Sequence, residues 1–217
     1  DSEGDLWYGT NNGISLQDSK TGKWRSFLST FENVQNSKNH IFTTLCEVSP
    51  GIIWAGGYFS GLYQIDKRTS KTTYFTPASY AHESIRPDKY IRDIRKDSRG
   101  YVWSGGYYNL KRINVQTKDI RLYHGLHSVT AIIEKDDKSM WIGTATGLFL
   151  LDIESGKYER IQLPVESTYV YSLYQTQKGA LYIGTSGSGV LIYDPQTKLF
   201  THYYILKFDM ISNYIYT

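Results

Sequence analysis

The sequence predicts an all-β protein made of repeats, and three observations carry this prediction. A phrase with an aromatic anchor, followed two residues later by glycine, occurs five times, at Trp7, Trp54, Trp103, Trp141 and Tyr182. The anchors lie 38 to 49 residues apart, which is close to the period of four-stranded propeller blades. Short apolar runs alternate with turn residues, and no helical period is sustained. We therefore expect a β-propeller of four-stranded antiparallel blades, about five of them in this chain.

Each repeat predicts the same order of elements. A β-rich run comes first, at 42–48, 91–96, 129–134 and 170–175. A polar turn with glycine or charge leads to the anchor strand, and a glycine-bearing turn leads to the third strand. That strand ends 11 or 12 residues after the anchor, at Asp18, Asp66, Asn114, Asp152 and Asp194. A fourth strand follows, with a large apolar residue nine positions further on, at Phe27, Phe75, Tyr123, Ile161 and Tyr203.

The repeat ranges follow from this register. We expect one propeller segment over 1–217, with blades at about 1–40, 41–89, 90–127, 128–168 and 169–210. The first residues, Asp1-Ser2-Glu3-Gly4, match the inner turn Asp97-Ser98-Arg99-Gly100, so the first copy is expected to lack its first strand. Residues 211–217 read as the start of another inner strand.

The anchor phrase has a structural explanation. One blade alone is a small sheet with two apolar faces, which is unstable in water. Stacked blades cover both faces, and we expect the anchor rings to fill the space between neighbouring sheets. The glycines are expected to permit a tight turn and a close approach of the backbone.

Composition narrows the class of protein. The chain of 217 residues carries a net charge of only +3, too small and too scattered to predict binding of nucleic acid. Cys46 is the single cysteine, which excludes an internal disulfide and leaves both a cytoplasmic and an extracytoplasmic location open. The 20 tyrosines favour strands.

The best-formed copies resemble a known repeat. Residues 129–152 and 170–194 carry an apolar strand, a turn, Met140-Trp141-Ile142-Gly143-Thr144 or its counterpart Leu181-Tyr182-Ile183-Gly184-Thr185, and a closing Asp. This pattern is similar to the two-component regulator propeller repeat. The third and fifth copies depart from it, with Asn114 for Asp and Tyr182 for Trp.

The resemblance implies a biological setting. It implies part of a seven-bladed propeller in the periplasmic sensor region of a Bacteroidetes-type hybrid two-component system. The histidine kinase, the receiver, the DNA-binding domain and the membrane anchor would then lie outside this chain. It also implies an oligosaccharide ligand from polysaccharide degradation, and we expect a homodimer formed through the parent ectodomain.

Two blades differ from the rest at the turn after the anchor strand. These turns hold Tyr58-Phe59 and Tyr107-Tyr108-Asn109, where the fourth and fifth copies have small residues. Two long inter-blade segments, 28–40 and 76–89, flank these blades, and the second holds His82 and Arg86. Aromatic rings beside amides and cations suit a sugar ligand, although such residues can also pack against loops or a partner.

The inner strands supply a second candidate set. The aligned residues there, expected to line the axial channel, are Thr43, Arg92, Thr130, Tyr171 and Tyr216. Arg92 reads as a buried cation that needs a partner, and Asp93 or a neighbouring blade could provide it.

The sequence predicts no catalytic, metal or cofactor site. His124 and His127 lie in a short inter-blade segment without further ligands nearby in the sequence. The Asp markers recur in every blade, as turn residues do and as a catalytic acid would not. Two alternatives to a sensor stay open: a scaffold propeller used for dimerisation, and, less favoured, a lyase or hydrolase propeller.

Overall fold

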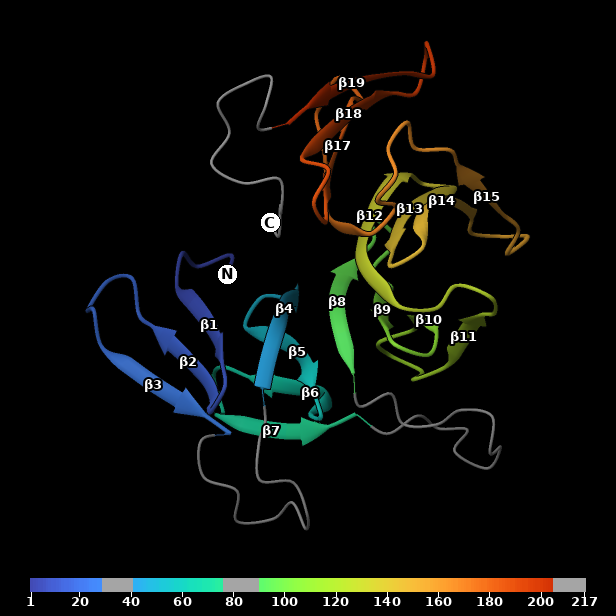
Figure 1. Cartoon of the computed structure of the whole chain (residues 1–217). Helices are drawn as coiled ribbons and strands as arrows, with labels where there is room; N and C mark the ends of the chain where they lie inside the picture. Colours follow the sequence, from blue (N-terminus) through green and yellow to red (C-terminus); the bar gives the residue numbers. More distant parts are fainter. Residues whose placement is uncertain (29–40, 76–89, 205–217) are drawn as a thin grey trace. The chain divides into compact units, whose positions relative to one another are not determined.

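The computed structural model describes residues 1–28, 41–75 and 90–204 (Figure 1). Within these ranges every helix or strand assigned is a β-strand, and the strands form five antiparallel sheets, one for each repeat. The prediction of an all-β fold with about five blades is therefore confirmed.

Each sheet is a meander whose strands follow one another in sequence order. The first has three strands, β1 (Leu6–Thr10), β2 (Gly13–Gln17) and β3 (Trp24–Phe27). The second comprises β4 (Ile41–Ser49), β5 (Ile52–Tyr58), β6 (Gly61–Asp66) and β7 (Lys71–Tyr74). The third comprises β8 (Ile91–Lys96), β9 (Val102–Gly106), β10 (Leu110–Ile113) and β11 (Ile120–Tyr123).

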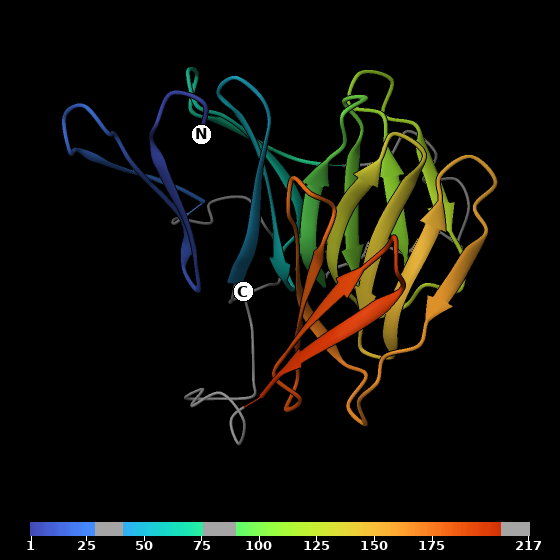
Figure 2. The ribbon, with the colours of Figure 1, turned by 90° about the horizontal axis from the view of Figure 1, so that it is seen from above.

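The last two sheets repeat this plan. The fourth comprises β12 (Val129–Asp136), β13 (Ser139–Thr144), β14 (Gly147–Asp152) and β15 (Tyr158–Ile161), and Figure 2 shows its strands side by side. The fifth comprises β16 (Val170–Gln175), β17 (Leu181–Thr185), β18 (Val190–Asp194) and β19 (Leu199–Tyr203). The strands of each sheet lie within one expected repeat range, and residues 211–217 lie outside the described part.

The chain divides into two compact units, Asp1–Leu122 and Tyr123–Thr217. The first unit holds the first three sheets except Tyr123, the last residue of β11, and the second unit holds the last two sheets. The units are described separately below.

The turn before the anchor strand is tied to the anchor ring. In the third sheet Asp97 accepts hydrogen bonds from the backbone N–H groups of Arg99 and Tyr101, at 3.1 and 2.9 Å, and from Trp103 Nε1 at 2.9 Å. Asp97 also pairs with Arg112 at 3.2 Å. The first sheet repeats the arrangement, since Trp7 Nε1 donates to Asp1 Oδ2 at 2.9 Å. The predicted equivalence of the two turns is therefore confirmed.

Neighbouring sheets pack through both faces of the anchor strand. Residues that follow one another in a strand point to opposite faces. In the first unit Trp54 packs with Ile91 and Ile94 of the third sheet, whereas Ile53 packs with Ile14 of the first. In the second unit Trp141 packs with Val170 and Leu181 of the fifth sheet. These contacts confirm that anchor rings fill the space between sheets.

Glycine at the second residue after the anchor allows this close packing. A Cβ atom on Gly56 would lie 2.6 Å from Ile91 Cγ2, and one on Gly143 would lie 2.7 Å from Val170 Cγ1. On Gly9 it would lie 2.5 Å from the carbonyl oxygen of Phe42. In these three copies the first strand of the next sheet occupies the space that a side chain would need, which explains the glycine.

One face of the first sheet and one of the fifth are exposed. Leu6 is 54% exposed although Ile53, at the same repeat position, is 2% exposed. The anchor Tyr182 is 39% exposed, against 1% for Trp141. A given position of the repeat is thus buried where a neighbouring sheet covers it, and exposed on these two faces.

A cluster of charges joins the first and second sheets. The Lys67 ammonium contacts Asp1, Glu3 and Asp5 at 2.9, 2.5 and 2.6 Å, and Lys67 and Asp5 are buried. Hydrogen bonds, first from Lys67 and then from Ser19, hold the pKa of Asp5 well below its usual range. Burial opposes the charge on Lys67, but its bonds to Asp5 and Glu3 raise its pKa above the ordinary value.

We expect replacement of Asp97 by Ala to lower the free energy of unfolding by about 2–4 kcal/mol, because it leaves buried Trp103 and Arg112 without their acceptor. Asp119→Ala, on an exposed turn of the same sheet, should change it by less than about 0.5 kcal/mol. Chemical denaturation measures both. Equal losses for the two variants would contradict the role of the turn.

The charge cluster predicts how stability depends on pH. Because the pKa of Asp5 is depressed in the fold, its contribution is present above about pH 4 and is lost as the pH falls through the folded-state pKa. Because the pKa of Lys67 is raised, its contribution is lost only as the pH rises above about 10. Thermal melting between pH 7 and pH 3 should show a smaller loss for Asp5→Asn than for the wild type. An identical loss would show that Asp5 does not contribute.

Candidate functional site

The turns after β5 and β9 display aromatic side chains, as the sequence predicts. Tyr58 ends β5, and Phe59 follows with a backbone φ of 60°. A bulky residue rarely takes this left-handed conformation because it costs energy. The neighbouring Ser60 is buried and donates to the carbonyl oxygens of Ile41 and Tyr58, at 3.2 and 3.0 Å. The turn therefore holds Phe59 in a backbone conformation that is sterically unfavourable for a residue with a Cβ atom.

Five rings of the first unit form one connected group, which we call the aromatic patch: Tyr58, Phe59, Tyr90, Tyr107 and Tyr108. Tyr90 lies at its centre, with its ring centroid 4.8 Å from that of Phe59, 6.2 Å from that of Tyr107 and 6.3 Å from that of Tyr58. Tyr108 joins through Tyr107, with centroids 4.9 Å apart.

The backbone brings the two turns together. Tyr58 forms an isolated antiparallel bridge with Tyr90, and the N–H of Tyr107 donates to the carbonyl oxygen of Tyr90 at 3.2 Å. Tyr90 immediately precedes β8 and so connects the second sheet with the third. Tyr90 is not among the residues predicted from the sequence, although its place just before the inner strand, two residues from Arg92, was a usable signal.

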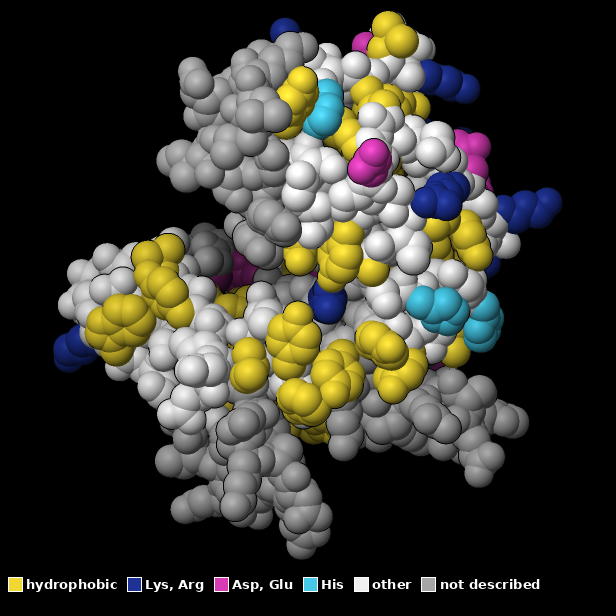
Figure 3. Space-filling view, viewed as in Figure 1, with side chains coloured by type: hydrophobic (Ala, Val, Ile, Leu, Met, Phe, Trp, Pro, Cys, Tyr) yellow, Lys and Arg dark blue, Asp and Glu magenta, His cyan; other side chains and the backbone are white. Residues whose placement is uncertain are grey.

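The aromatic patch is open to solvent. Phe59, Tyr107 and Tyr108 are 49%, 55% and 40% exposed. Figure 3 shows hydrophobic side chains gathered where Figure 1 places β4–β8. Exposed apolar side chains that gather on one surface are a common feature of binding and association sites.

Arg92 brings a positive charge to the aromatic patch. It lies in β8, is half-buried, and its guanidinium carbon lies 5.9 Å from the centroid of the Tyr58 ring. The neighbouring Asp93 is paired with Arg95, with Oδ1 to Nε at 3.2 Å. Arg92 is thus less buried than the sequence suggested, and an aromatic face is one of its contacts.

The remaining predicted residues are placed as follows. Asn109 is half-buried and follows Tyr108 in the turn before β10. His82 and Arg86 lie outside the described residues, as does Tyr216.

Two aligned residues of the inner strands form hydrogen bonds to the next sheet. Thr43 Oγ1 donates to the carbonyl oxygen of Ile91 at 3.4 Å, and Thr130 Oγ1 donates to that of Val170 at 2.5 Å. At this repeat position threonine therefore links adjacent sheets.

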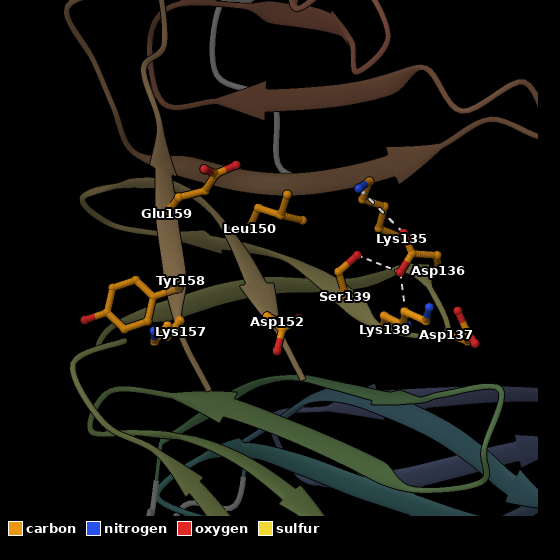
Figure 4. Close-up of a pocket in the computed structure, with 10 residues that line it drawn as sticks. All are labelled: Lys135, Asp136, Asp137, Lys138, Ser139, Leu150, Asp152, Lys157, Tyr158 and Glu159. Carbon is orange, nitrogen blue, oxygen red and sulfur yellow. Dashed lines mark hydrogen bonds and ion pairs between the residues drawn. The ribbon is translucent and has the colours of Figure 1, made fainter. Parts of the chain in front are cut away.

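A hollow lies on the fourth sheet, in the second unit. It encloses about 660 Å³ between the β12–β13 turn and the strands β14 and β15 (Figure 4). Its acidic side chains include Asp136, which accepts from Ser139 Oγ at 2.7 Å and contacts Lys135 at 3.5 Å. Burial acts to raise the pKa of Asp136, but these bonds and that of Lys138 N–H keep it below its usual value. Asp152 accepts from Ser155 Oγ at 2.7 Å, so these two carboxylates hold turns.

The described residues offer no group of three or more His, Cys, Asp or Glu side chains that could hold a metal ion. His124 and His127 are both exposed. In the same residues, no helix is long and apolar enough to cross a membrane.

The family comparison agrees with the resemblance in the sequence. Residues 164–187 match the model of the two component regulator propeller. This stretch holds β16 and the anchor phrase of the fifth sheet, so the prediction of this repeat is confirmed. No curated protein matches the chain in sequence.

Solved structures share the fold. Two are extracellular domains assigned to hybrid two component systems of B. thetaiotaomicron: one is 18% identical with a TM-score of 0.78, the other 21% identical with a TM-score of 0.71. The alignments cover 100% and 91% of this chain but only 30% and 26% of those chains. This chain thus spans less than a third of either. A third is virginiamycin B lyase from Staphylococcus aureus, 14% identical with a TM-score of 0.72, covering 93% of this chain and 67% of that one.

Phe59→Asn tests whether the strained turn serves stability. Asparagine tolerates a positive φ better than phenylalanine does. Because half of the Phe59 side chain is already exposed, we expect the free energy of unfolding to change by no more than about 0.5 kcal/mol. A loss of 2 kcal/mol or more on chemical denaturation would instead assign Phe59 to the core.

Proposed function

We propose that this chain is a ligand-recognition part of the extracytoplasmic sensor propeller of a hybrid two-component signalling protein. The match of residues 164–187 to the two component regulator propeller carries the proposal, because the same phrase recurs in all five sheets. The likeness to extracellular domains of such systems supports it. The location would be periplasmic, in a protein of the inner membrane.

The ligand that we propose is an oligosaccharide from polysaccharide degradation. The aromatic patch supplies exposed rings, onto which the C–H face of a sugar stacks. Arg92, beside Tyr58, and Asn109, beside Tyr108, supply directional donors for hydroxyl oxygens. Binding would be relayed to a histidine kinase outside this chain, with the membrane anchor and the homodimer contacts also provided by the parent protein.

A scaffold propeller used for dimerisation is the second candidate. The exposed aromatic patch also favours this function, because contiguous apolar surface often marks a protein interface. The two candidates differ in what the patch contacts: a sugar in the first, another protein surface in the second.

The likeness to virginiamycin B lyase raises a third possibility, a propeller enzyme. At 14% identity the likeness concerns the fold. The aromatic patch and its turns, 57–61 and 106–109, contain no Asp, Glu or His, the side chains that most often act as general acid and base. Turnover of a polysaccharide by the purified protein would nevertheless overturn the sensor assignment.

Calorimetric titration of the full-length protein with a panel of oligosaccharides tests the sensor proposal. We expect at least one of them to bind with a Kd in the micromolar to millimolar range, with heat that vanishes when the patch is altered. The absence of binding to every member, with the protein folded, would count against direct sensing.

Tyr107→Ala separates sensor from scaffold. Loss of stacking should weaken sugar binding about five-fold or more, since one aromatic contact is worth about 1–3 kcal/mol in comparable stacking, while the oligomeric state stays unchanged. Tyr158→Ala, at an exposed tyrosine of the hollow in Figure 4, is the matched control and should bind as the wild type does.

The opposite results are equally informative. A Tyr107→Ala protein that loses its dimer in sedimentation but keeps its sugar affinity would favour the scaffold. A loss of affinity in Tyr158→Ala alone would move the ligand to the hollow on the fourth sheet.

A further inference from the structure

We propose that the aromatic patch is a two-part site that selects sugar chains of three or more units over mono- and disaccharides, and that Tyr90 sets the spacing of its two parts. This inference rests on the proposed function, because it specifies the class of oligosaccharide that the same site takes.

The exposed rings of the aromatic patch come from two different sheets. Phe59 follows β5 of the second sheet, whereas Tyr107 and Tyr108 follow β9 of the third. All three rings are substantially exposed. The corresponding turn of the fourth sheet has only the small residues Ala145 and Thr146. The patch therefore offers two places for stacking, one on each of two neighbouring turns.

Tyr90 connects the two places. Its ring contacts the ring of Phe59 on one side and that of Tyr107 on the other, with centroids 4.8 and 6.2 Å apart. Its backbone pairs with Tyr58 and accepts the N–H of Tyr107 at 3.2 Å. Because both turns are bonded to this one residue, the spacing between their rings is set by the backbone before a ligand arrives.

The turn that carries Phe59 is itself fixed. Ser60 is buried and donates to the carbonyl oxygens of Ile41 and Tyr58, at 3.2 and 3.0 Å. The backbone of Phe59 is thereby kept at a φ of 60°. Rings that are positioned in advance lose less conformational entropy on binding. A ligand thus gains both contacts only if its own length matches the spacing of the two turns.

The size of a sugar unit sets the length of the ligand. The apolar face of one pyranose covers about one aromatic ring, so a single unit stacks on one part of the site. A chain that stacks on Phe59 and also on Tyr107 passes over Tyr90, whose ring contacts both. Three linked units therefore make the shortest chain that we expect to use the whole site.

The second contact should appear as a step in affinity. One aromatic contact is worth about 1–3 kcal/mol in comparable stacking, which is a factor of about five or more in Kd. In a linked chain this second contact is intramolecular, so it adds to the affinity of the first. Affinity should therefore rise when the chain reaches both parts, and lengthening the chain further should bring no comparable gain.

The experiment is calorimetry on the full-length protein with linear sugars of increasing length. The probes are the malto-, cello-, xylo- and manno-oligosaccharides, each from the monosaccharide to the pentasaccharide. In at least one series we expect the trisaccharide or tetrasaccharide to bind about five-fold or more tightly than the disaccharide. The pentasaccharide should show no second step.

Variants of each part locate the step. Phe59→Asn and Tyr107→Ala each remove one stacking ring, so in either variant the tetrasaccharide should bind about as weakly as the disaccharide. Tyr90→Ala should abolish the step as well, because it removes the ring between the two parts, and Tyr90→Phe, which keeps that ring, should restore it. Tyr158→Ala, at an exposed tyrosine of the fourth sheet, is the matched control and should keep the step.

Each outcome decides between the claims. Binding that is equally tight for the disaccharide and the pentasaccharide overturns the two-part site and leaves the sensor function in place. A step that persists in Phe59→Asn or in Tyr107→Ala overturns the assignment of the parts, and one that persists in Tyr90→Ala overturns the role of Tyr90. If no sugar of any series binds the folded protein, the inference is overturned together with direct sensing of these sugars.

Discussion

The close approach of one sheet to the first strand of the next is the constraint on which the rest of the structure depends. Gly56 and Gly143 face Ile91 and Val170 with no room for a Cβ atom, so in these two pairs of sheets the inner strand lies directly against the anchor strand before it. The anchor rings Trp54 and Trp141 pack over the same interface. This geometry also brings Tyr90, at the start of β8, against the end of β5, and thereby assembles the aromatic patch.

Contacts that recur between repeats contrast with turns that depart from the repeat. Asp97 holds its turn, its anchor ring and Arg112 at once, and Asp1 repeats two of these contacts in the first sheet. The turns after β5 and β9 depart from the repeat: Phe59 is held at a positive φ, and its side chain is half in solvent. Under the proposed function, the exposed ring of Phe59 serves recognition, and the turn holds it in place.

The fold could be predicted from the sequence because the repeat imposes one register on all five copies. The anchor phrase located every sheet, and Tyr58, Phe59, Tyr107 and Tyr108 were recognised as breaks in its pattern. The sequence did not indicate Tyr90, because its role depends on which strand end meets which turn in space. Nor did it indicate that Trp103 bonds to Asp97, or that Arg92 lies against Tyr58, since both contacts depend on side-chain direction across strands. For His82 and Arg86, which lie outside the described residues, the prediction stays a prediction.

A double-mutant cycle on Gly143 and Val170 tests the central constraint most directly. Gly143→Ala alone should lower the free energy of unfolding by about 1–3 kcal/mol, because the new methyl group overlaps Val170 Cγ1. In the Val170→Ala background, where that atom is absent, the same substitution should cost at least about 1 kcal/mol less. Strictly additive effects of the two substitutions, or a Gly143→Ala protein as stable as the wild type, would contradict the account.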